Sequence, residues 1–261
     1  MILGGVKGLV LDLDGCVYVG DTPVDGAPEA IETLQRHFKL LYLTNNSTLT
    51  RKQYAEKLRR MDINAEPNQI LTSGYVAVNY ILSINPRARI LVVGEDGVTV
   101  EALEAGLEVV DHNEWRRADF VVVGLDRKLT YEKLANAALA ISAGAKFIAT
   151  NLDHVYPSER GFLPGAGSIA ALLATTTKVT PYAVGKPEKQ SSEIALKMLG
   201  LSKEGVVFVG DRVDTDVKAG KIVGCRAVLV KTGAFKLLGG LTGEADAVIE
   251  SVADLPQLLG I

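Results

Sequence analysis

Two aspartates stand two residues apart, directly after an apolar run, and their types and spacing suit them for chemistry. Asp12 and Asp14 follow residues 6–11, which read as a buried strand. Residues i and i+2 of a strand point to the same side, and like charges held that close raise one pKa or require a cation. The pattern favours a nucleophile, an acid–base group and a metal ligand at the carboxyl edge of an open α/β sheet. The plainer alternative is a solvated Asp-Gly turn.

Three further groups of polar residues follow other strand-like runs. In chain order they are Thr44 with Asn45 and Asn46, then Lys186, and then Asp211 with Asp214 and Asp216. Parallel strands of an α/β sheet end at one shared edge, so all four groups meet if their strands are neighbours. Each group alone also has an ordinary explanation, namely helix capping, an exposed loop lysine, or a solvated acidic loop. Their joint occurrence at four strand ends favours one shared site.

Brought together, these side chains suit phosphoryl transfer. Carboxylate oxygens from two strands form a hard-oxygen site for Mg²⁺, which keeps several waters and binds few protein ligands plus substrate phosphate. Lys186, Thr44 and the two asparagines supply a positive charge and hydrogen-bond donors for phosphate oxygens. One aspartate can act as nucleophile through an aspartyl-phosphate. A second carboxyl group can protonate the leaving oxygen and then activate water.

The elements that must position these residues are strand-like and helix-like segments in alternation, which predicts a mostly parallel sheet with helices on its faces. The strands expected in the first and last parts of the chain are residues 8–13, 40–43, 70–73, 182–184, 206–209, 227–230 and 247–249. A second α/β block lies between them, with strands expected at residues 89–93, 120–123 and 146–149. Helices are expected at residues 27–37, 50–61, from 73 to about 82, 97–105, 130–142 and 166–174. The simplest account is one discontinuous core domain with a second domain inserted in its middle.

Composition narrows the class of protein. The 261 residues fit one large domain or two moderate ones, and 48% apolar residues are ample for a packed core. A net charge of −3 offers no basic face for nucleic acid. The apolar runs are of strand length, which argues against a membrane span, and the first residues do not read as a signal peptide. The two cysteines, Cys16 and Cys225, suit a reducing compartment, so we expect a cytoplasmic protein.

The motifs resemble those of the haloacid dehalogenase (HAD) superfamily of phosphotransferases. The matching segments are Asp12-Leu13-Asp14-Gly15, Thr44, Gly185-Lys186-Pro187 and Gly210 through Asp216. The spacing and the long insertion between Thr44 and Lys186 are similar to the NagD-like, p-nitrophenyl phosphatase branch. The resemblance covers nearly the whole chain. It implies an α/β fold with a Rossmann-like HAD core, built on a mostly parallel sheet, plus a large inserted α/β cap domain. The core is expected over residues 1–75 and 181–261, and the cap over residues 76–180.

The resemblance also implies a role for each matching residue. Asp12 would be the nucleophile and a Mg²⁺ ligand, and Asp14 the general acid–base that also binds the metal through its backbone carbonyl. Asp211 would be the second carboxylate ligand, with Asp216 behind it in the metal's outer shell. The phosphate would be bound by Thr44, Asn45, Asn46 and Lys186. In the cap, Asp153 and Tyr156 are candidates for substrate specificity.

The function expected from these residues is hydrolysis of a small phosphomonoester, such as a sugar phosphate or p-nitrophenyl phosphate, by a Mg²⁺-dependent phosphatase. Two alternatives stay open. A phosphomutase would use the same chemistry but pass the phosphate to another sugar hydroxyl. A receiver-like module would bind phosphate in the acidic pocket without turnover. The partner is a small molecule rather than nucleic acid or a membrane, and the resemblance to this branch also allows a homodimer.

Overall fold

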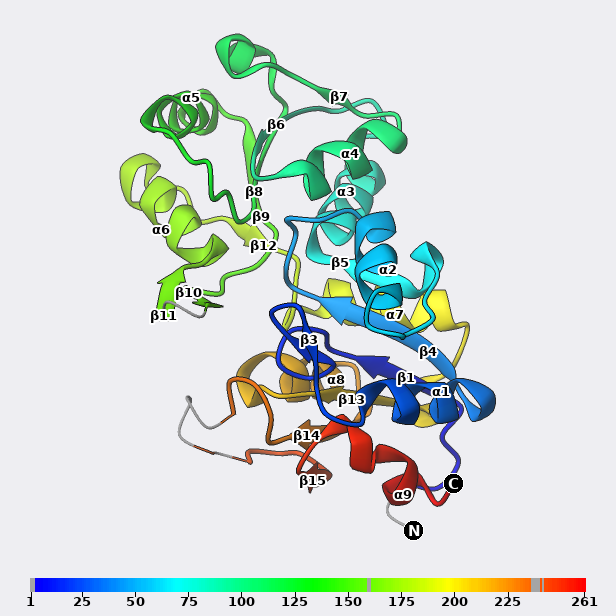
Figure 1. Cartoon of the computed structure of the whole chain (residues 1–261). Coiled ribbons are helices and arrows are strands. Elements are labelled where there is room, and N and C mark those ends of the chain that lie inside the picture. The colour runs from blue at the N-terminus through cyan, green and yellow to red at the C-terminus, as the bar shows by residue number, and fades with distance from the viewer. Residues whose placement is uncertain (1–2, 159–160, 236–239, 241) are drawn as a thin grey trace. The chain divides into compact units, whose positions relative to one another are not determined.

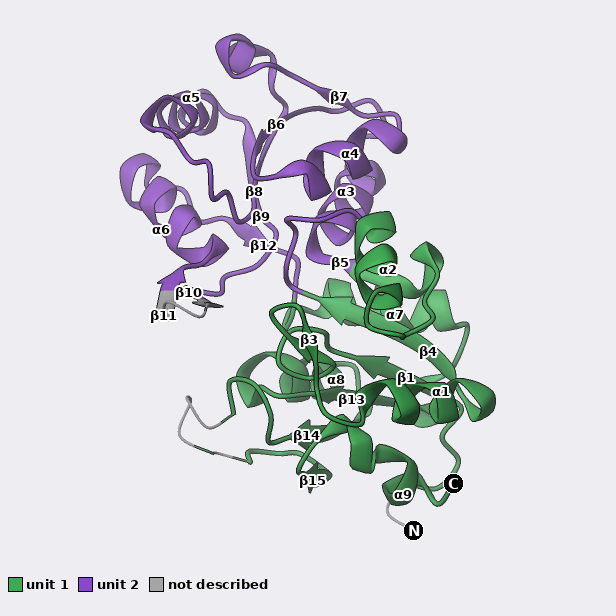
Figure 2. Ribbon diagram, in the orientation of Figure 1, with its two compact units in different colours: residues 1–44, 51–71, 186–261 green, residues 45–50, 72–185 purple. Residues whose placement is uncertain are grey.

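The computed structural model describes residues 3–158, 161–235, 240 and 242–261. The chain divides into two compact units (Figures 1 and 2). The first unit contains residues 1–44, 51–71 and 186–261, and the second contains residues 45–50 and 72–185. These limits lie a few residues from the domain boundaries expected at 75/76 and 180/181, which stay predictions. The short segment 45–50, directly after the expected phosphate-binding Thr44, groups with the second unit.

The first unit is built on a six-stranded sheet. In spatial order its strands are β15 (Ala247–Ile249), β14 (Arg226–Val230), β13 (Val206–Gly210), β1 (Gly8–Leu11), β4 (Lys39–Thr44) and β5 (Ile70–Thr72). The pairings from β15 through to β4 are all parallel. Ranked by chain position within this sheet, the order is 3-2-1-4-5-6, which is that of doubly wound dinucleotide-binding folds. In such a sheet the connections leave in opposite directions at one point, here between β1 and β13, and open a crevice there.

Helices and short turns surround this sheet. They are α1 (Ala27–His37), α2 (Arg51–Arg59), η1 (Pro67–Gln69), α7 (Lys189–Leu199), η3 (Lys203–Gly205), η4 (Val213–Val217), α8 (Lys218–Ile222), η5 (Val252–Asp254) and α9 (Leu255–Leu259). A small antiparallel hairpin, β2 (Tyr18–Val19) and β3 (Thr22–Pro23), follows β1. The helix predicted at residues 27–37 is confirmed, and Ala27, Ile31 and Leu34 form its buried stripe. Pro28 in its first turn lacks an N–H that the helix would leave unbonded there in any case.

The second unit has its own sheet of five parallel strands. In spatial order they are β12 (Tyr182–Ala183), β9 (Lys146–Ala149), β8 (Phe120–Val123), β6 (Arg89–Val93) and β7 (Glu108–Val109). Ranked by chain position the order is 2-1-3-4-5, which is the flavodoxin-like form of the doubly wound fold. Its connections part between β6 and β8. The second unit is therefore a complete α/β sheet rather than an elaborated loop.

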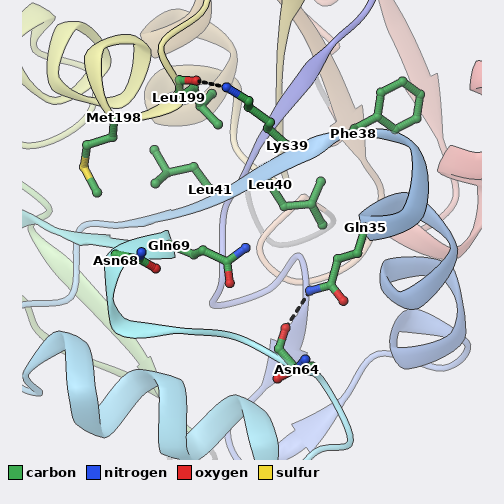
Figure 3. Close-up of a pocket in the computed structure, with 10 residues that line it drawn as sticks. All are labelled: Gln35, Phe38, Lys39, Leu40, Leu41, Asn64, Asn68, Gln69, Met198 and Leu199. Carbon is green, nitrogen blue, oxygen red and sulfur yellow. Dashed lines mark hydrogen bonds between the residues drawn. The ribbon is translucent and has the colours of Figure 1, made fainter.

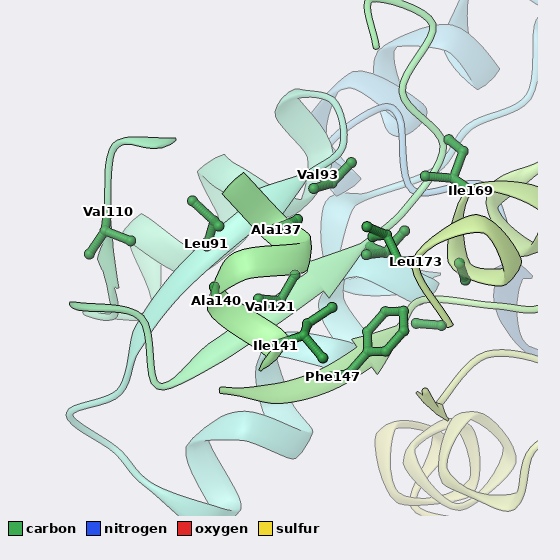
Figure 4. Packing of buried hydrophobic residues seen from close by; sticks show 13 residues of the cluster. Leu91, Val93, Val110, Val121, Ala137, Ala140, Ile141, Phe147, Ile169 and Leu173 are labelled. Carbon is green, nitrogen blue, oxygen red and sulfur yellow. The ribbon is translucent and has the colours of Figure 1, made fainter. Parts of the chain in front are cut away.

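A hydrophobic core of its own holds the second unit together (Figure 4). Leu91, Val121 and Phe147 of the sheet pack against Ile141 of α5 (Tyr131–Ser142) and Leu173 of α6 (Ala166–Thr177). The remaining elements of this unit are α3 (Ser73–Ile84), α4 (Asp96–Glu104), η2 (His112–Arg117) and the hairpin of β10 (Val155–Ser158) and β11 (Gly161–Pro164). Across the described ranges of both units, we find no helix with the length and apolarity needed to span a bilayer.

One strand prediction is wrong in its partner. The segment at residues 182–184 was expected to continue the sheet of the first unit, but β12 pairs with β9 in the second sheet. A strand of two residues has the composition of a strand but carries no pattern that specifies its neighbour. Three of the four strands expected to share one edge are neighbours, in the order β13-β1-β4. Lys186 instead begins the return of the chain to the first unit after β12.

Candidate active site

Three buried carboxylates gather where β1 and β13 end. Asp12 follows β1 and Asp211 follows β13, and the backbone N–H of Asp12 donates to the carbonyl of Val209 at 2.8 Å. Asp216 reaches the same place from η4, a π-helical turn. One carboxylate oxygen from each aspartate lies within 4.8 Å of the others. The three side chains therefore occupy the point where the connections of the first sheet part.

Lys186 is the cation of this cluster. Its ammonium group donates to Oδ1 of Asp12 and to Oδ1 of Asp216, both at 2.6 Å. It also donates to the backbone carbonyl of Leu43 at 3.1 Å, near the end of β4. The side chain is buried, so the ion pairs are little screened by solvent. A single lysine thus bonds to residues that follow β1 and β13 and to a residue near the end of β4.

The cluster carries more negative than positive charge. Burial raises the pKa of Asp12 well above its usual range, the charges of Asp216 and Asp211 add to that rise, and Lys186 opposes it. Burial and the charge of Asp216 also raise the pKa of Asp211 to about 7. Burial lowers the pKa of Lys186, but Asp12 and Asp216 outweigh it and raise that pKa overall. Three carboxylates against one ammonium group form a site to which a divalent cation is electrostatically suited.

A loop that was not predicted to be part of the site holds Asp211 in place. The backbone N–H of Ala234, after β14, donates to Oδ2 of Asp211 at 2.5 Å. Gly15 and Gly233 have φ values of +91° and +57°, and a Cβ on either would lie 2.3 or 2.2 Å from the same oxygen. Both positions require glycine for conformation and for space. A glycine-containing turn after a fifth apolar strand was the signal available in the sequence.

Asp14 stands apart from the three clustered carboxylates. Its Oδ2 accepts a hydrogen bond from the hydroxyl of Tyr18 at 3.3 Å. The Asp14 side chain keeps access to solvent. The surrounding protein atoms nevertheless desolvate its carboxyl group in part, and this raises its pKa. Lys57, the Tyr18 hydroxyl and the Thr44 hydroxyl act against that rise because each favours the charged form. Asp14 and Thr44 thus lie together at the ends of β1 and β4.

Asn45 and Asn46 are engaged within the second unit. The carbonyl of Asn45 accepts hydrogen bonds from Ser73 at 2.5 Å and Asn151 at 2.7 Å. The side-chain amide of Asn45 donates to Oδ2 of Asp153 at 2.9 Å. Oδ1 of Asn46 accepts from the backbone N–H and the hydroxyl of Thr48 at 3.1 and 2.8 Å. Tyr156, the other cap candidate, lies in β10 and pairs with Leu163 of β11.

Asp153 is therefore linked to Asn45 rather than being an isolated cap residue. Its backbone N–H also donates to the side chain of Asn151 at 3.0 Å. The segment after β4 and the loop after β9 thus share three polar residues, Asn45, Asn151 and Asp153, in one hydrogen-bonded group. Sequence reasoning named Asn45 and Asp153 separately and did not connect them.

Two other features of the first unit are not part of the cluster's chemistry. Cys16 is buried, and burial together with the charge of Asp12 raises the pKa of its thiol well above the usual value, so the thiol stays protonated. An open pocket of about 490 Å³ lies where β4 begins (Figure 3). Its polar groups bond to one another, as when Gln35 donates to the carbonyl of Asn64 and Lys39 to that of Leu199. It lies at the amino end of β4, opposite the edge that carries the carboxylates.

The chain matches two family models and several curated proteins. Residues 9–108 match the model described as haloacid dehalogenase-like hydrolase, and residues 183–255 match one described as HAD-hydrolase-like. The acid sugar phosphatase of Staphylococcus haemolyticus is 43% identical over 228 residues, which is 87% of this chain and 86% of that protein. The acid sugar phosphatase of a Staphylococcus aureus strain is 44% identical over 232 residues, 88% of each chain.

Solved structures that align with this chain are also phosphatases. A thermostable NPPase double mutant from Geobacillus stearothermophilus aligns with a TM-score of 0.88 at 42% identity, covering 96% of this chain and 98% of that one. The 4-nitrophenylphosphatase of Thermotoga maritima aligns with a TM-score of 0.91 at 33% identity, covering 99% of both chains. The chain therefore belongs to the haloacid dehalogenase-like hydrolases, in the NagD-like branch that contains the p-nitrophenyl phosphatases, and it is a phosphatase.

Proposed function

We propose that this protein hydrolyses small phosphomonoesters with the help of Mg²⁺, through an aspartyl-phosphate (an acyl phosphate) formed on Asp12. The observation that carries the proposal is the buried group of Asp12, Asp211 and Asp216 around Lys186 at the parting of the strand connections. The relatives named acid sugar phosphatase and p-nitrophenyl phosphatase suggest the substrates. We therefore expect turnover of sugar phosphates and of p-nitrophenyl phosphate.

The side chains divide the reaction into two steps. An Asp12 oxygen attacks phosphorus, the bond from phosphorus to the ester oxygen breaks, and Asp14 gives its proton to the departing oxygen. Asp14 then takes a proton from water, whose oxygen attacks the same phosphorus. The bond from phosphorus to Asp12 breaks, and inorganic phosphate and the Asp12 carboxylate are released. Lys186 and Thr44 bind the phosphoryl oxygens, and positioning with charge neutralisation supplies most of the rate enhancement.

The metal is proposed from the chemistry of the donors. Lys186 bonds to Oδ1 of Asp12, and the Ala234 N–H bonds to Oδ2 of Asp211. The opposite oxygen of each carboxylate is the proposed Mg²⁺ ligand, together with the backbone carbonyl of Asp14. An all-oxygen set with few protein ligands suits Mg²⁺. When bound, the ion neutralises negative charge beside the phosphate.

Asp216 has a supporting role in this proposal. Its Oδ1 accepts from Lys186 at 2.6 Å and its Oδ2 accepts from the backbone N–H of Arg212 at 3.0 Å. Both oxygens are therefore occupied by protein donors. We assign Asp216 to orienting Lys186 and the outer shell of the metal.

The remaining assignments concern the second unit and the state of the protein. We propose that residues 76–180 act as the cap, and that Asn45 and Asn46 bind phosphate. In the cap, Asp153 and Tyr156 affect which phosphomonoester is accepted. A homodimer and a cytoplasmic location complete the proposal, and each stays a prediction.

The test is the substitution Asp12→Asn, which keeps the shape of the side chain and removes its nucleophilic charge. Turnover of p-nitrophenyl phosphate with Mg²⁺ should fall below detection while the thermal melting curve stays cooperative. The matched control is Asp126→Asn, at a buried aspartate of the second unit that pairs with Lys133, and it should keep turnover. Retained turnover in Asp12→Asn excludes Asp12 as the nucleophile.

Product analysis separates the proposed reaction from its alternatives. Inorganic phosphate released in step with the loss of a sugar phosphate supports a hydrolase, whereas a rearranged sugar phosphate indicates a phosphomutase. Absence of turnover across a broad panel of phosphomonoesters with Mg²⁺ indicates a module that only binds phosphate.

A further inference from the structure

We propose that Tyr18 is a positioning residue that orients the carboxyl group of Asp14 for proton transfer to the leaving group, and that Lys57 holds Tyr18 in place. The inference deepens the proposed function and rests on the acid–base role of Asp14. It adds two residues that neither the motifs nor the strand ends had pointed to. All three residues belong to the first unit.

The geometry around Asp14 is unusually well fixed for an exposed carboxylate. Tyr18 is fully buried, at 0% exposure, yet its hydroxyl reaches Oδ2 of Asp14 at 3.3 Å. The intervening turn is closed by backbone bonds, from Gly15 N–H to the Tyr18 carbonyl at 2.7 Å and from Tyr18 N–H to the Leu13 carbonyl at 3.2 Å. The ring and the carboxylate are therefore held at the two ends of one rigid turn.

Lys57 fixes the ring from another element. It lies on α2, and its ammonium nitrogen is 4.0 Å from the centre of the Tyr18 ring, a cation–π distance. The same nitrogen donates to the carbonyl of Gly20 at 2.7 Å and lies 3.3 Å from a carboxylate oxygen of Asp21. Lys57 thus connects α2 to β2 and to the turn of the β2–β3 hairpin. A positive charge over a phenol ring also strengthens its hydroxyl as a donor.

This arrangement has a chemical consequence for one oxygen of Asp14. A donor on Oδ2 disfavours a proton on that oxygen, so in this proposal Oδ1 carries the proton that is transferred. The hydroxyl stabilises the carboxylate that remains after the proton has left. The hydroxyl of Tyr18 is the donor in this bond.

The size of the effect must depend on the leaving group. An alkoxide departing from a sugar or glycerol phosphate is strongly basic and needs a proton as the bond breaks. Nitrophenolate is weakly basic and leaves without one. A residue that only fills space beneath the turn would affect both substrates alike, whereas one that orients the acid affects the alkyl phosphate selectively.

The experiment compares kcat/KM for glycerol phosphate and p-nitrophenyl phosphate in Tyr18→Phe, which removes only the hydroxyl. We expect about a tenfold loss for glycerol phosphate and less than about a twofold loss for p-nitrophenyl phosphate. The matched control is Tyr42→Phe, at another fully buried tyrosine of the first unit whose hydroxyl receives a bond from Gln35, and it should change neither value. Equal losses on both substrates, or a loss on neither, overturn the proposal.

Two further variants keep the test decisive. Lys57→Met retains the apolar stem and removes the charge, so it should give a smaller loss with the same substrate selectivity, even if Tyr18→Phe fails to fold. Loss of that selectivity in a folded Lys57→Met overturns the role of Lys57. Asp14→Asn separates the two levels of the argument. Full activity of Asp14→Asn on both substrates overturns the role of Asp14 itself, whereas a loss there without selectivity in Tyr18→Phe overturns the positioning role alone.

Discussion

The two mostly parallel sheets of this chain share a design and differ in what fills the point where their connections part. In the first sheet that point lies between β1 and β13 and holds Asp12 and Asp211. In the second sheet it lies between β6 and β8. Doubly wound folds bind their ligands in this crevice. Topology alone would therefore assign a candidate site to each sheet.

The second crevice is occupied by the chain itself. Segment 45–50 lies across the carboxyl ends of β6, β8 and β9, where the N–H of Gly97 donates to the carbonyl of Thr48 at 3.2 Å. Ser47 and Thr150 approach within 3.4 Å through their hydroxyl oxygens. A Cβ at Gly97 would lie 2.3 Å from the Ser47 carbonyl oxygen, and one at Gly124 would lie 2.5 Å from the Ser47 hydroxyl. Small residues here admit a main chain where the first sheet has carboxylates.

The comparison teaches that the fold supplies the crevice and the residues after the strands decide its use. Charged residues at the first crevice favour the binding of a cation and an anion. At the second crevice, glycines and hydroxyl groups satisfy the backbone of a neighbouring segment. Variants at equivalent places in the two sheets should therefore have unequal effects on activity.

The largest contrast in activity is expected between substitutions of Lys186 and Lys133, which pair with aspartates in the first and second units. Lys186→Met removes a phosphate-binding charge and leaves buried carboxylates without their cation, so kcat/KM for p-nitrophenyl phosphate should fall about 10³-fold. Lys133→Met breaks the ion pair with Asp126 in the second unit and should change kcat/KM less than about twofold. Steady-state kinetics with Mg²⁺ checks both variants. Similar losses in the two would remove the distinction between the crevices.

Asp211→Asn should lower activity while raising the stability of the metal-free protein. The loss of a metal ligand should reduce kcat about 10²-fold. Removing one of three crowded negative charges should raise the melting temperature in the presence of a chelator by about 2–4 °C. Asp126→Asn should do the opposite, since it leaves Lys133 without its partner. A lower melting temperature for metal-free Asp211→Asn would contradict the repulsion inferred among the carboxylates.

The response to Mg²⁺ should depend on pH in a defined direction. The pKa of Asp211 is raised to about 7 by burial and by Asp216, so its contribution to the stability of the metal-free protein is full below the ordinary aspartate pKa and is lost as pH rises through about 7. Mg²⁺ binds the ionised carboxylate, so the increase in melting temperature on adding Mg²⁺ should be larger at about pH 8 than at about pH 5.5. Thermal melting with Mg²⁺ or chelator measures it. An equal increase at both pH values would count against Asp211 as a ligand.

The smallest effect on activity is expected from removing a hydrogen bond that holds segment 45–50 in place. Asn151→Asp replaces the donor to the Asn45 carbonyl with an acceptor, which should raise KM for p-nitrophenyl phosphate about tenfold or less, in line with the loss of one buried hydrogen bond. The matched control is Asn79→Asp, since Asn79 also donates to a carbonyl of the second unit, that of Tyr75, at 2.9 Å. Equal KM values in the two variants would show that the hold on segment 45–50 does not reach the substrate.

Much of the fold follows from local patterns in the sequence. The strands at residues 89–93, 120–123, 146–149 and 247–249 are confirmed to the residue. For the first three the reason is that continuous β-branched and apolar runs of that length are typical of buried parallel strands. The helix at Ala27–His37 is confirmed because its apolar residues recur at helical spacing and form one buried stripe. The expected meeting of Asp12 with Asp211 is borne out as well, since residues after neighbouring parallel strands share an edge.

The misplaced and missed features are those that depend on distant partners. Tyr182–Ala183 has too few residues to specify which sheet it joins. Gly233 signals a turn after β14, but that turn alone does not indicate that the backbone N–H of Ala234 bonds to Asp211. Tyr18 was available in the sequence as an aromatic residue four positions after Asp14. Its hydrogen bond to Asp14 can be recognised only in the structure, because the backbone bonds of the intervening turn bring the two side chains together.

The most direct test of this account is the position of a divalent cation in crystals grown with Mn²⁺, which shares the preference of Mg²⁺ for carboxylate oxygens and is located by its anomalous scattering. The account predicts a peak within coordination distance of carboxylate oxygens of both Asp12 and Asp211. A peak at the ends of β6 and β8 instead, or clear density for Asp12 and Asp211 with no metal between them, would contradict it.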